Sequence, residues 1–165
     1  MSITQTTPAQ SPTGIISDTN VTATSTGLPV TLTAHTSYRT LLRVITPATA
    51  GDVLDITGRA RVTNDCGYVI GVGHHLWMYD VDNGLGSSGT WTKIGPSNGD
   101  NVEPKRHHMP LHIEYVYRVP ASWPAGHRMV VVYRAEAHST AAQTGDVVDV
   151  DALGVLTVRR WAEVA

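Results

Sequence analysis

Residues 53–63, VLDITGRARVT, alternate strictly between apolar and polar side chains, and this pattern limits the possible folds more than any other feature of the sequence. This period is typical of a strand that buries one face and leaves the other in water. No segment has a 3.6-residue apolar period with capping residues, so helices are not expected. The apolar face is expected to carry Leu54, Ile56, Ala60 and Val62, and the polar face Asp55, Thr57, Arg59 and Arg61.

Short runs of the same kind recur along the chain, separated by segments rich in Gly and Pro. The many Val and Thr residues suit the pleated surface of a sheet. About eight strands with loops of unequal length predict an all-β fold, an antiparallel β-sandwich of jelly-roll type with an extended N-terminal arm. The expected strands are 28–33, 40–46, 53–63, 68–80, 90–94, 111–119, 128–137 and 152–161.

Two connections in the middle of the chain carry turn signals. The segment 64–67, NDCG, separates strand 53–63 from strand 68–80 by only four residues. We therefore expect these two strands to pair as a long hairpin. The segment 95–104, GPSNGDNVEP, is rich in Gly and Pro and predicts a break in the strand pattern.

The first 27 residues differ in composition from the rest and define an arm. They are mostly Thr, Ser, Pro, Gly and Gln, with Ile15 and Ile16 as a paired apolar spot. Such a segment has too little apolar surface to offset its ordering entropy alone. We divide the chain into an arm, residues 1–27, and a sandwich domain, residues 28–165. The arm is either a disordered tail or an added strand on a neighbouring subunit, anchored by Ile15, Ile16 and Leu28.

Composition argues against several classes of partner. The net charge is −2, and the longest basic run is Lys105 and Arg106, which is too little to neutralise nucleic acid phosphates. Cys66 is the only cysteine, so a disulfide within the chain is not expected. No apolar run approaches the roughly 20 residues of a membrane helix, and the N-terminus has no secretion signal. We expect a protein made in the cytoplasm that binds neither membrane nor nucleic acid.

Two adjacent histidine pairs, at 74–75 and 107–108, raise the question of a metal site. Neighbouring side chains on a strand point to opposite faces, so neither pair can chelate one ion through both rings. His112 lies on the outward face of its strand, four residues after His108. Spacings typical of cupins, nucleophile elbows and calcium loops are also missing. The sequence therefore predicts no catalytic residues, no metal ligands and no cofactor.

The strand 68–80 has one unusual face. His74 shares a face with the apolar residues, whereas Gly71, Gly73, His75, Trp77 and Tyr79 form the other. Large aromatic side chains exposed on a sheet usually mark an interface. The alternative is that the chain's own layers and loops cover this face. The candidate subunit-interface residues are Ile15, Ile16, Leu28, His75, Trp77 and Tyr79.

In architecture, residues 28–164 resemble jelly-roll virion proteins of tailed phages of high-GC hosts. The stretches GDVLDITGRARVTNDCGYVIGVGHHLWMYD and ALGVLTVRRW carry this likeness, together with the Thr- and Ser-rich arm. The resemblance implies a structural protein located in the virion, most of all a capsid decoration or cement protein, less so a tail component. It further implies a homo-oligomer, with a trimer favoured, that binds a major capsid or tail protein. It fixes no site residues.

A carbohydrate-binding module or lectin-like tail or fibre domain is the alternative function. Trp77, Tyr79, Trp91 and Trp123 would then be platforms on which sugar rings stack. Jelly rolls support both functions, so the fold alone does not choose between them. The long Thr-rich arm favours assembly, because a sugar-binding module has no use for it.

Overall fold

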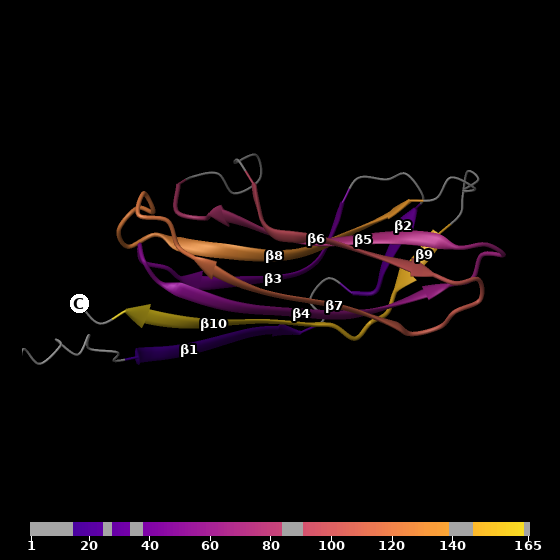
Figure 1. The fold of residues 1–165 in the computed structure, drawn as a ribbon, viewed down its shortest axis with the longest axis horizontal. Coiled ribbons are helices and arrows are strands. Elements are labelled where there is room, and N and C mark those ends of the chain that lie inside the picture. The colour runs from indigo at the N-terminus through magenta and orange to yellow at the C-terminus, as the bar shows by residue number, and fades with distance from the viewer. Residues whose placement is uncertain (1–14, 25–27, 34–37, 84–90, 139–146, 164–165) are drawn as a thin grey trace, which may run out of the picture.

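The chain folds into two antiparallel β-sheets packed face to face (Figure 1). The computed structural model describes residues 15–24, 28–33, 38–83, 91–138 and 147–163, with the backbone alone for 15–24 and 163. Within these ranges there are ten strands. They are β1 (Ile15–Thr24), β2 (Val30–Thr33), β3 (Arg39–Pro47), β4 (Val53–Asn64), β5 (Ile70–Asp80), β6 (Thr92–Val102), β7 (Met109–Arg118), β8 (Arg128–His138), β9 (Val147–Val150) and β10 (Val155–Glu163).

The strand order is that of a jelly roll. One sheet has the order β1–β10–β4–β7, with β2 and β9 continuing β1 and β10 beyond a break and β9 pairing with β4. The other sheet has the order β3–β8–β5–β6. If β1 with β2 and β9 with β10 each count as one interrupted strand, the fold is an eight-stranded double Greek key. The predicted fold class, an antiparallel sandwich of jelly-roll type, is confirmed.

The predicted hairpin between the third and fourth expected strands is wrong, because β4 and β5 belong to opposite sheets. The residue that turns the chain from one sheet to the other is Asn64, which is fully buried. Its Nδ2 donates to the carbonyl oxygens of Tyr68 and Val102, both at 2.9 Å, and its Oδ1 accepts from the backbone N–H of Cys66. The side chain thus supplies partners to backbone groups that no neighbouring strand reaches.

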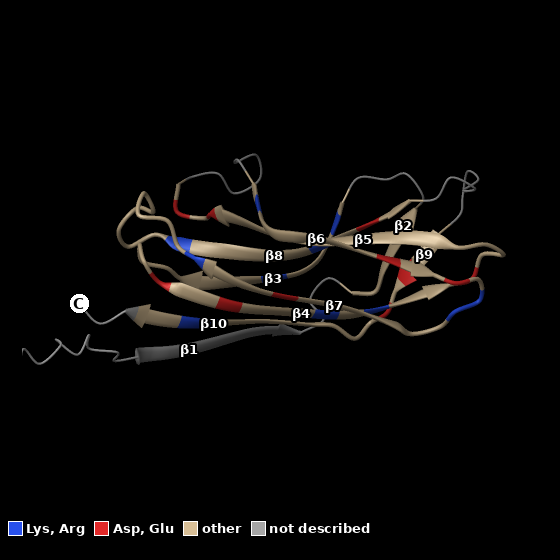
Figure 2. Ribbon diagram, viewed as in Figure 1, with Lys and Arg blue, Asp and Glu red and all other residues tan. Residues whose placement is uncertain are grey.

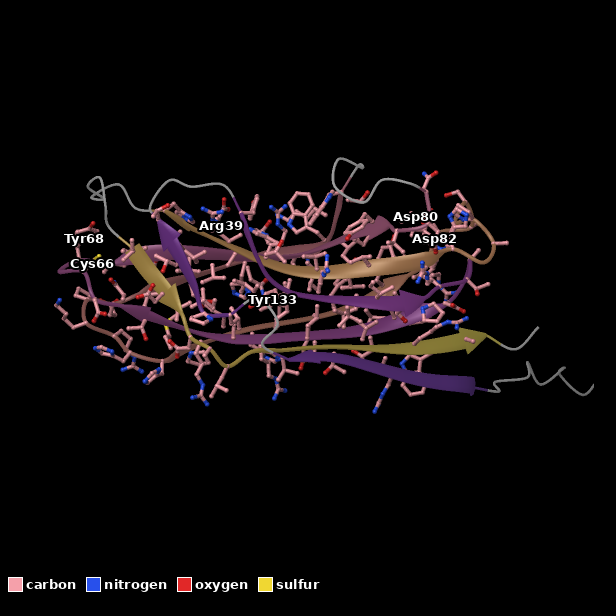
Figure 3. The ribbon with its side chains drawn as sticks, turned by 180° about the vertical axis from the view of Figure 1, so that it is seen from behind. Arg39, Cys66, Tyr68, Asp80, Asp82 and Tyr133 are labelled. Carbon is pink, nitrogen blue, oxygen red and sulfur yellow. The ribbon has the colours of Figure 1, made fainter. Side chains whose placement is uncertain are left out.

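The predicted alternation of β4 is confirmed. Its inward residues are buried against the second sheet, and its outward residues are half-buried or exposed. Near the middle of the strand, Gly58 lies under the ring of Tyr133 from β8. A Cβ on Gly58 would come within 2.9 Å of Ile113 and 3.2 Å of the Tyr133 ring. Figure 3 shows Tyr133 between the two sheets, where its ring fills the space that Gly58 leaves.

Strand β6 runs through residues that the sequence analysis assigned to a break. β5 and β6 change register between His74, opposite Asn98, and Leu76, opposite Ile94, so β6 accommodates extra residues in a bulge. Gly95 begins this bulge with φ +77 and lies against the Tyr115 ring. Pro96 is tolerated because β6 is an edge strand. The short strand β9 was also not predicted, since its four residues follow a polar Gly-containing segment.

Residues 15–24, assigned above to the arm, form β1 and pair with β10 of the same chain (Figure 1). The register joins Thr24 to Val155 at one end and Ile15 to Glu163 at the other. Strand pairing therefore begins well before residue 28. The reason is that a sheet edge offers main-chain hydrogen bonds to a segment with few apolar side chains.

Charged residues of both signs are distributed over the two sheets (Figure 2). In the part of the chain that the structure describes, no helix has the length and apolar character needed to span a bilayer.

Candidate interface on the outer face of the second sheet

The outer face of the β3–β8–β5–β6 sheet carries an apolar cluster. Tyr79 of β5 is 7 % exposed, and Val130 and Val132 of β8 are fully buried there. Trp77 and Trp91 are half-buried and pack against this cluster. This side of the sheet faces away from the other sheet. Apolar residues on it are therefore shielded from water only if other side chains of the chain or of a partner cover them.

The cover includes a group of rings arranged around one guanidinium. We call the residues Tyr38, His75, Trp77, Tyr79, Trp91 and Arg134 the aromatic face. The Cζ atom of Arg134 lies 4.7 Å from the ring centroid of Trp91, 5.3 Å from that of Tyr38 and 5.4 Å from that of Trp77. These distances are typical of cation–π contacts. The guanidinium of Arg134 also donates a hydrogen bond of 2.9 Å to the carbonyl oxygen of Tyr38, which fixes its position.

The rings of the aromatic face also contact one another. Tyr38 meets His75 edge-on at 5.0 Å and Trp77 at 5.5 Å between centroids. Tyr79 and Trp91 are stacked at 5.0 Å with 27° between their planes. Segments distant in sequence therefore hold each aromatic residue of β5 in a defined orientation.

Several polar atoms of the aromatic face are buried without a hydrogen-bond partner in the described structure. They are both ring nitrogens of His75, Nε1 of Trp77 and Nε of Arg134. Glu136 Oε1 lies 3.6 Å from His75 Nε2, too far for a good hydrogen bond. Each such atom costs about 1–3 kcal/mol of desolvation. This face of the subunit therefore carries unsatisfied hydrogen-bonding capacity.

Burial shifts the pKa values of the titratable groups at this face. It lowers the pKa of His75, with the nearby Lys93 charge acting in the same direction and Glu136 opposing both. Burial, followed by a hydrogen bond to Glu136, raises the pKa of Tyr38. Burial also lowers the pKa of Arg134. Burial at the aromatic face thus disfavours the charged forms of these groups.

The predicted interface residues fall in three parts of the fold. His75, Trp77 and Tyr79 lie on the aromatic face, where His75 and Tyr79 are buried within the chain itself. Leu28 packs against the main core. Ile15 and Ile16 belong to β1 in the other sheet, and their side chains lie outside the described residues. The structure therefore does not bring the six residues together.

Sequence reasoning missed Tyr38 and Arg134. Arg134 had a detectable signal, because the outward positions of β8 read Val130, Val132, Arg134, and a charge that follows two buried valines needs a partner. Tyr38 had none, since it precedes β3 and meets β5 only through the tertiary fold.

Three further histidines each face a different carboxylate. The ring nitrogen distances are 2.6 Å from His108 to Asp151, 2.7 Å from His127 to Asp80 and 3.0 Å from His112 to Glu114. His112 is exposed, as predicted. Among the described residues no three of His, Cys, Asp and Glu gather as a metal site.

His74 belongs to a polar line inside the sandwich. Its Nδ1 lies 3.0 Å from the hydroxyl of Tyr133 and its Nε2 lies 3.0 Å from Asp100 Oδ2. A carboxylate accepts, so Nε2 carries the proton and Nδ1 accepts from the Tyr133 hydroxyl. Protonation of Nδ1 would leave that hydroxyl hydrogen without an acceptor. Burial lowers the pKa of His74, although Asp100 acts against this.

The lowered pKa values of His74 and His75 predict that acid destabilises the fold. The unfolded chain binds protons below the ordinary histidine pKa of 6.5, whereas the folded chain resists them. The stability that the neutral rings provide is complete above that pH and is lost as the pH falls through the folded pKa values. Denaturant unfolding measured from about pH 7.5 to about pH 5 should show a declining free energy of unfolding.

Two variants test whether this pH dependence comes from the buried histidines. His74→Gln should lose part of the slope, whereas His107→Gln, which changes an exposed ring that shifts the pKa of neither His74 nor His75, should keep it. A free energy of unfolding that is constant or rises toward acid would contradict the account.

No protein-family model matches the chain, and no curated protein matches it. Among solved structures, T=1 particles derived from infectious bursal virus match with a TM-score of 0.53 and 12 % identity. That match covers 100 % of this chain and 41 % of the viral chain. The infectious bursal disease virus Gt strain gives a TM-score of 0.41 and 13 % identity, over 92 % of this chain and 36 % of that one.

The first of these likenesses concerns the fold. The present chain spans about two-fifths of the viral chain, and the match shows a similar fold. A jelly-roll fold was expected from the sequence, and this likeness agrees with it.

Proposed function

We propose that the chain is a structural subunit of a viral particle, a capsid decoration or cement protein that binds and stabilises the shell as an oligomer. One observation carries this proposal. The chain matches, over its entire length, part of a protein solved as an assembled particle. Because jelly rolls also serve other functions, surface and charge must supply the further arguments.

The charge of the chain favours binding to the protein shell over binding to the packaged nucleic acid. Residues 1–27 contain Asp18 as their only charged side chain, and the whole chain carries a net charge of −2. Binding to a nucleic acid requires clustered Lys and Arg. The low charge of residues 1–27 and the net negative charge of the whole chain both agree with the resemblance to decoration proteins. That resemblance favours a trimer.

The aromatic face is the proposed contact between subunits. Trp77 is half-buried over a fully buried layer, and its Nε1 has no partner in the described structure. Rigid aromatic residues beside an Arg are the usual energetic centre of an interface. A partner that binds this face would pack against the exposed parts of the half-buried Trp77 and Trp91 side chains.

A sugar-binding role has less support. Tyr79 and Trp123 are 7 % and 9 % exposed, so neither presents a ring face to a sugar. Trp77 and Trp91 are already covered on one side by the Arg134 guanidinium. A stacking platform requires an open ring face.

The interface is tested by replacing Trp77 with alanine. The wild-type chain should be an oligomer by light scattering after gel filtration, and Trp77→Ala should weaken its association by about 2 kcal/mol, roughly thirtyfold. The circular dichroism of the strands should persist. Val116→Ala is the matched control, because Val116 is exposed on the other sheet.

Two results would count against this contact. One is a wild-type chain that stays monomeric at all concentrations. The other is a Trp77→Ala variant that melts at a lower temperature while its oligomeric state is unchanged, which would make Trp77 a covering residue of its own subunit.

A further inference from the structure

A pocket on the outer face of the first sheet lies apart from the aromatic face. Its volume is about 620 Å³, which is within the range of small-molecule sites. The floor is formed by Arg59 and Arg61 of β4, one wall by Pro110 and His112 of β7, and the other wall by Leu153 and Val155. Figure 1 shows β4 between β7 and β10, the strands that border the pocket.

The break between β9 and β10 creates this pocket. β10 pairs with β4 as far as Val155 opposite Arg59, and β9 resumes the pairing at Val150 opposite Val62. Residues 60–61 of β4 therefore face the longer segment 151–154, which must bulge out of the sheet. The backbone N–H of Asp151 donates a hydrogen bond of 2.9 Å to the carbonyl oxygen of Arg61, and this bond anchors the bulge. Leu153, at its outer edge, is 64 % exposed.

The two arginines on the floor are unpaired charges. Arg59 and Arg61 are consecutive residues on one strand face, about 7 Å apart along the strand, and both are exposed. In the described part of the chain neither forms an ion pair. The nearby carboxylates have other partners: Glu114 contacts His112 at 3.0 Å and Asp151 contacts His108 at 2.6 Å. Two adjacent like charges repel each other unless an anion lies between them.

We infer that this pocket binds an amphipathic carboxylate. The apolar body would rest against Pro110, Leu153 and Val155, and the carboxylate would lie between the guanidiniums of Arg59 and Arg61. Guanidinium groups suit this role because their planar N–H donors match the two oxygens of a carboxylate. A second, smaller hollow shares Arg59 and Val155 but includes Asp55. The charge of Asp55 would repel an anion, which favours a carboxylate on the side of Arg59 that faces Arg61.

The test is a calorimetric titration of the full chain with decanoate. We expect saturable binding of about one decanoate per chain. Decyltrimethylammonium, which has the same tail and the opposite charge, should not bind at this site. The double variant Arg59→Gln/Arg61→Gln should lower the affinity for decanoate at least about tenfold. Arg43→Gln is the matched control, since Arg43 is an exposed arginine on the other sheet.

The charged floor and the apolar wall are separated by one more variant. Leu153→Ser, which removes apolar surface without adding a charge, should also weaken decanoate binding, and thermal melts should show that each variant remains folded. The inference is overturned if decanoate does not bind saturably, if the cationic amphiphile binds equally well, or if the double arginine variant binds decanoate as the wild type does.

Discussion

Replacement of Tyr133 by alanine is expected to lower the free energy of unfolding by about 3–5 kcal/mol, the usual cost of removing a buried aromatic side chain. Tyr133 is fully buried, and its ring covers Gly58 of the opposite sheet. The change leaves a cavity that Gly58 cannot fill and removes the donor to His74 Nδ1. Chemical denaturation at neutral pH measures the effect.

The conservative variant Tyr133→Phe separates packing from hydrogen bonding. It keeps the ring over Gly58 and leaves His74 Nδ1 without a donor, which should cost about 1–3 kcal/mol. If Tyr133→Ala is no more destabilising than Tyr133→Phe, the ring does not hold the two sheets together as described.

Deletion of residues 1–27 is expected to weaken both the fold and its assembly. The deletion removes β1 and exposes the edge of β10 from Val155 to Glu163. The two sheets and their core remain, so the circular dichroism should still be that of a β-sandwich. The melting temperature should fall by roughly 5 °C or more, corresponding to about 2 kcal/mol. Binding to the shell or to other subunits should become much weaker, since an added strand supplies affinity through its main chain.

A synthetic peptide of residues 15–24, IISDTNVTAT, provides the control. Added in trans, it should restore the melting temperature of the truncated chain, whereas a scrambled peptide should not. The same main-chain pairing would allow β1 to join β10 of a neighbouring subunit, as in strand swapping. If the truncated chain melts and assembles like the full chain, the arm has neither role.

The fold class followed from the sequence because strand alternation reports burial directly. In β4, each inward residue faces the second sheet and each outward residue faces solvent, so the two-residue period appears without interruption. The faces of β5 were assigned correctly for the same reason: His74 is inside and His75, Trp77 and Tyr79 are outside.

Connections between strands were less predictable. A four-residue turn suggested a hairpin, but Asn64 directs the chain across to the other sheet. Its side chain donates to the carbonyl oxygens of Tyr68, Val102 and Glu103, and the last two lie almost 40 residues further along the chain. The Gly- and Pro-containing residues of β6 form a paired strand because β5 supplies the ladder and a bulge absorbs the irregularity. Both outcomes depend on tertiary contacts that local sequence does not encode.

The candidate interface was only partly predictable. Three aromatic-face residues of β5 were found from alternation, but Arg134 and Tyr38 come from other segments, and the guanidinium links the rings. The paired arginines of β4 were assigned to the polar face of a strand, whereas the bulge that makes a pocket beside them depends on the register of β9 and β10.

The central claim, that the chain is a structural component of a virion, is tested most directly by the protein composition of purified particles. Virus particles released from cells that express this sequence would be banded on a density gradient, and their proteins would be quantified by mass spectrometry. The account predicts that the chain migrates with the particles in a fixed ratio to the main shell protein. A chain found only in the soluble fraction of the infected cells, and absent from the particle band, would contradict it.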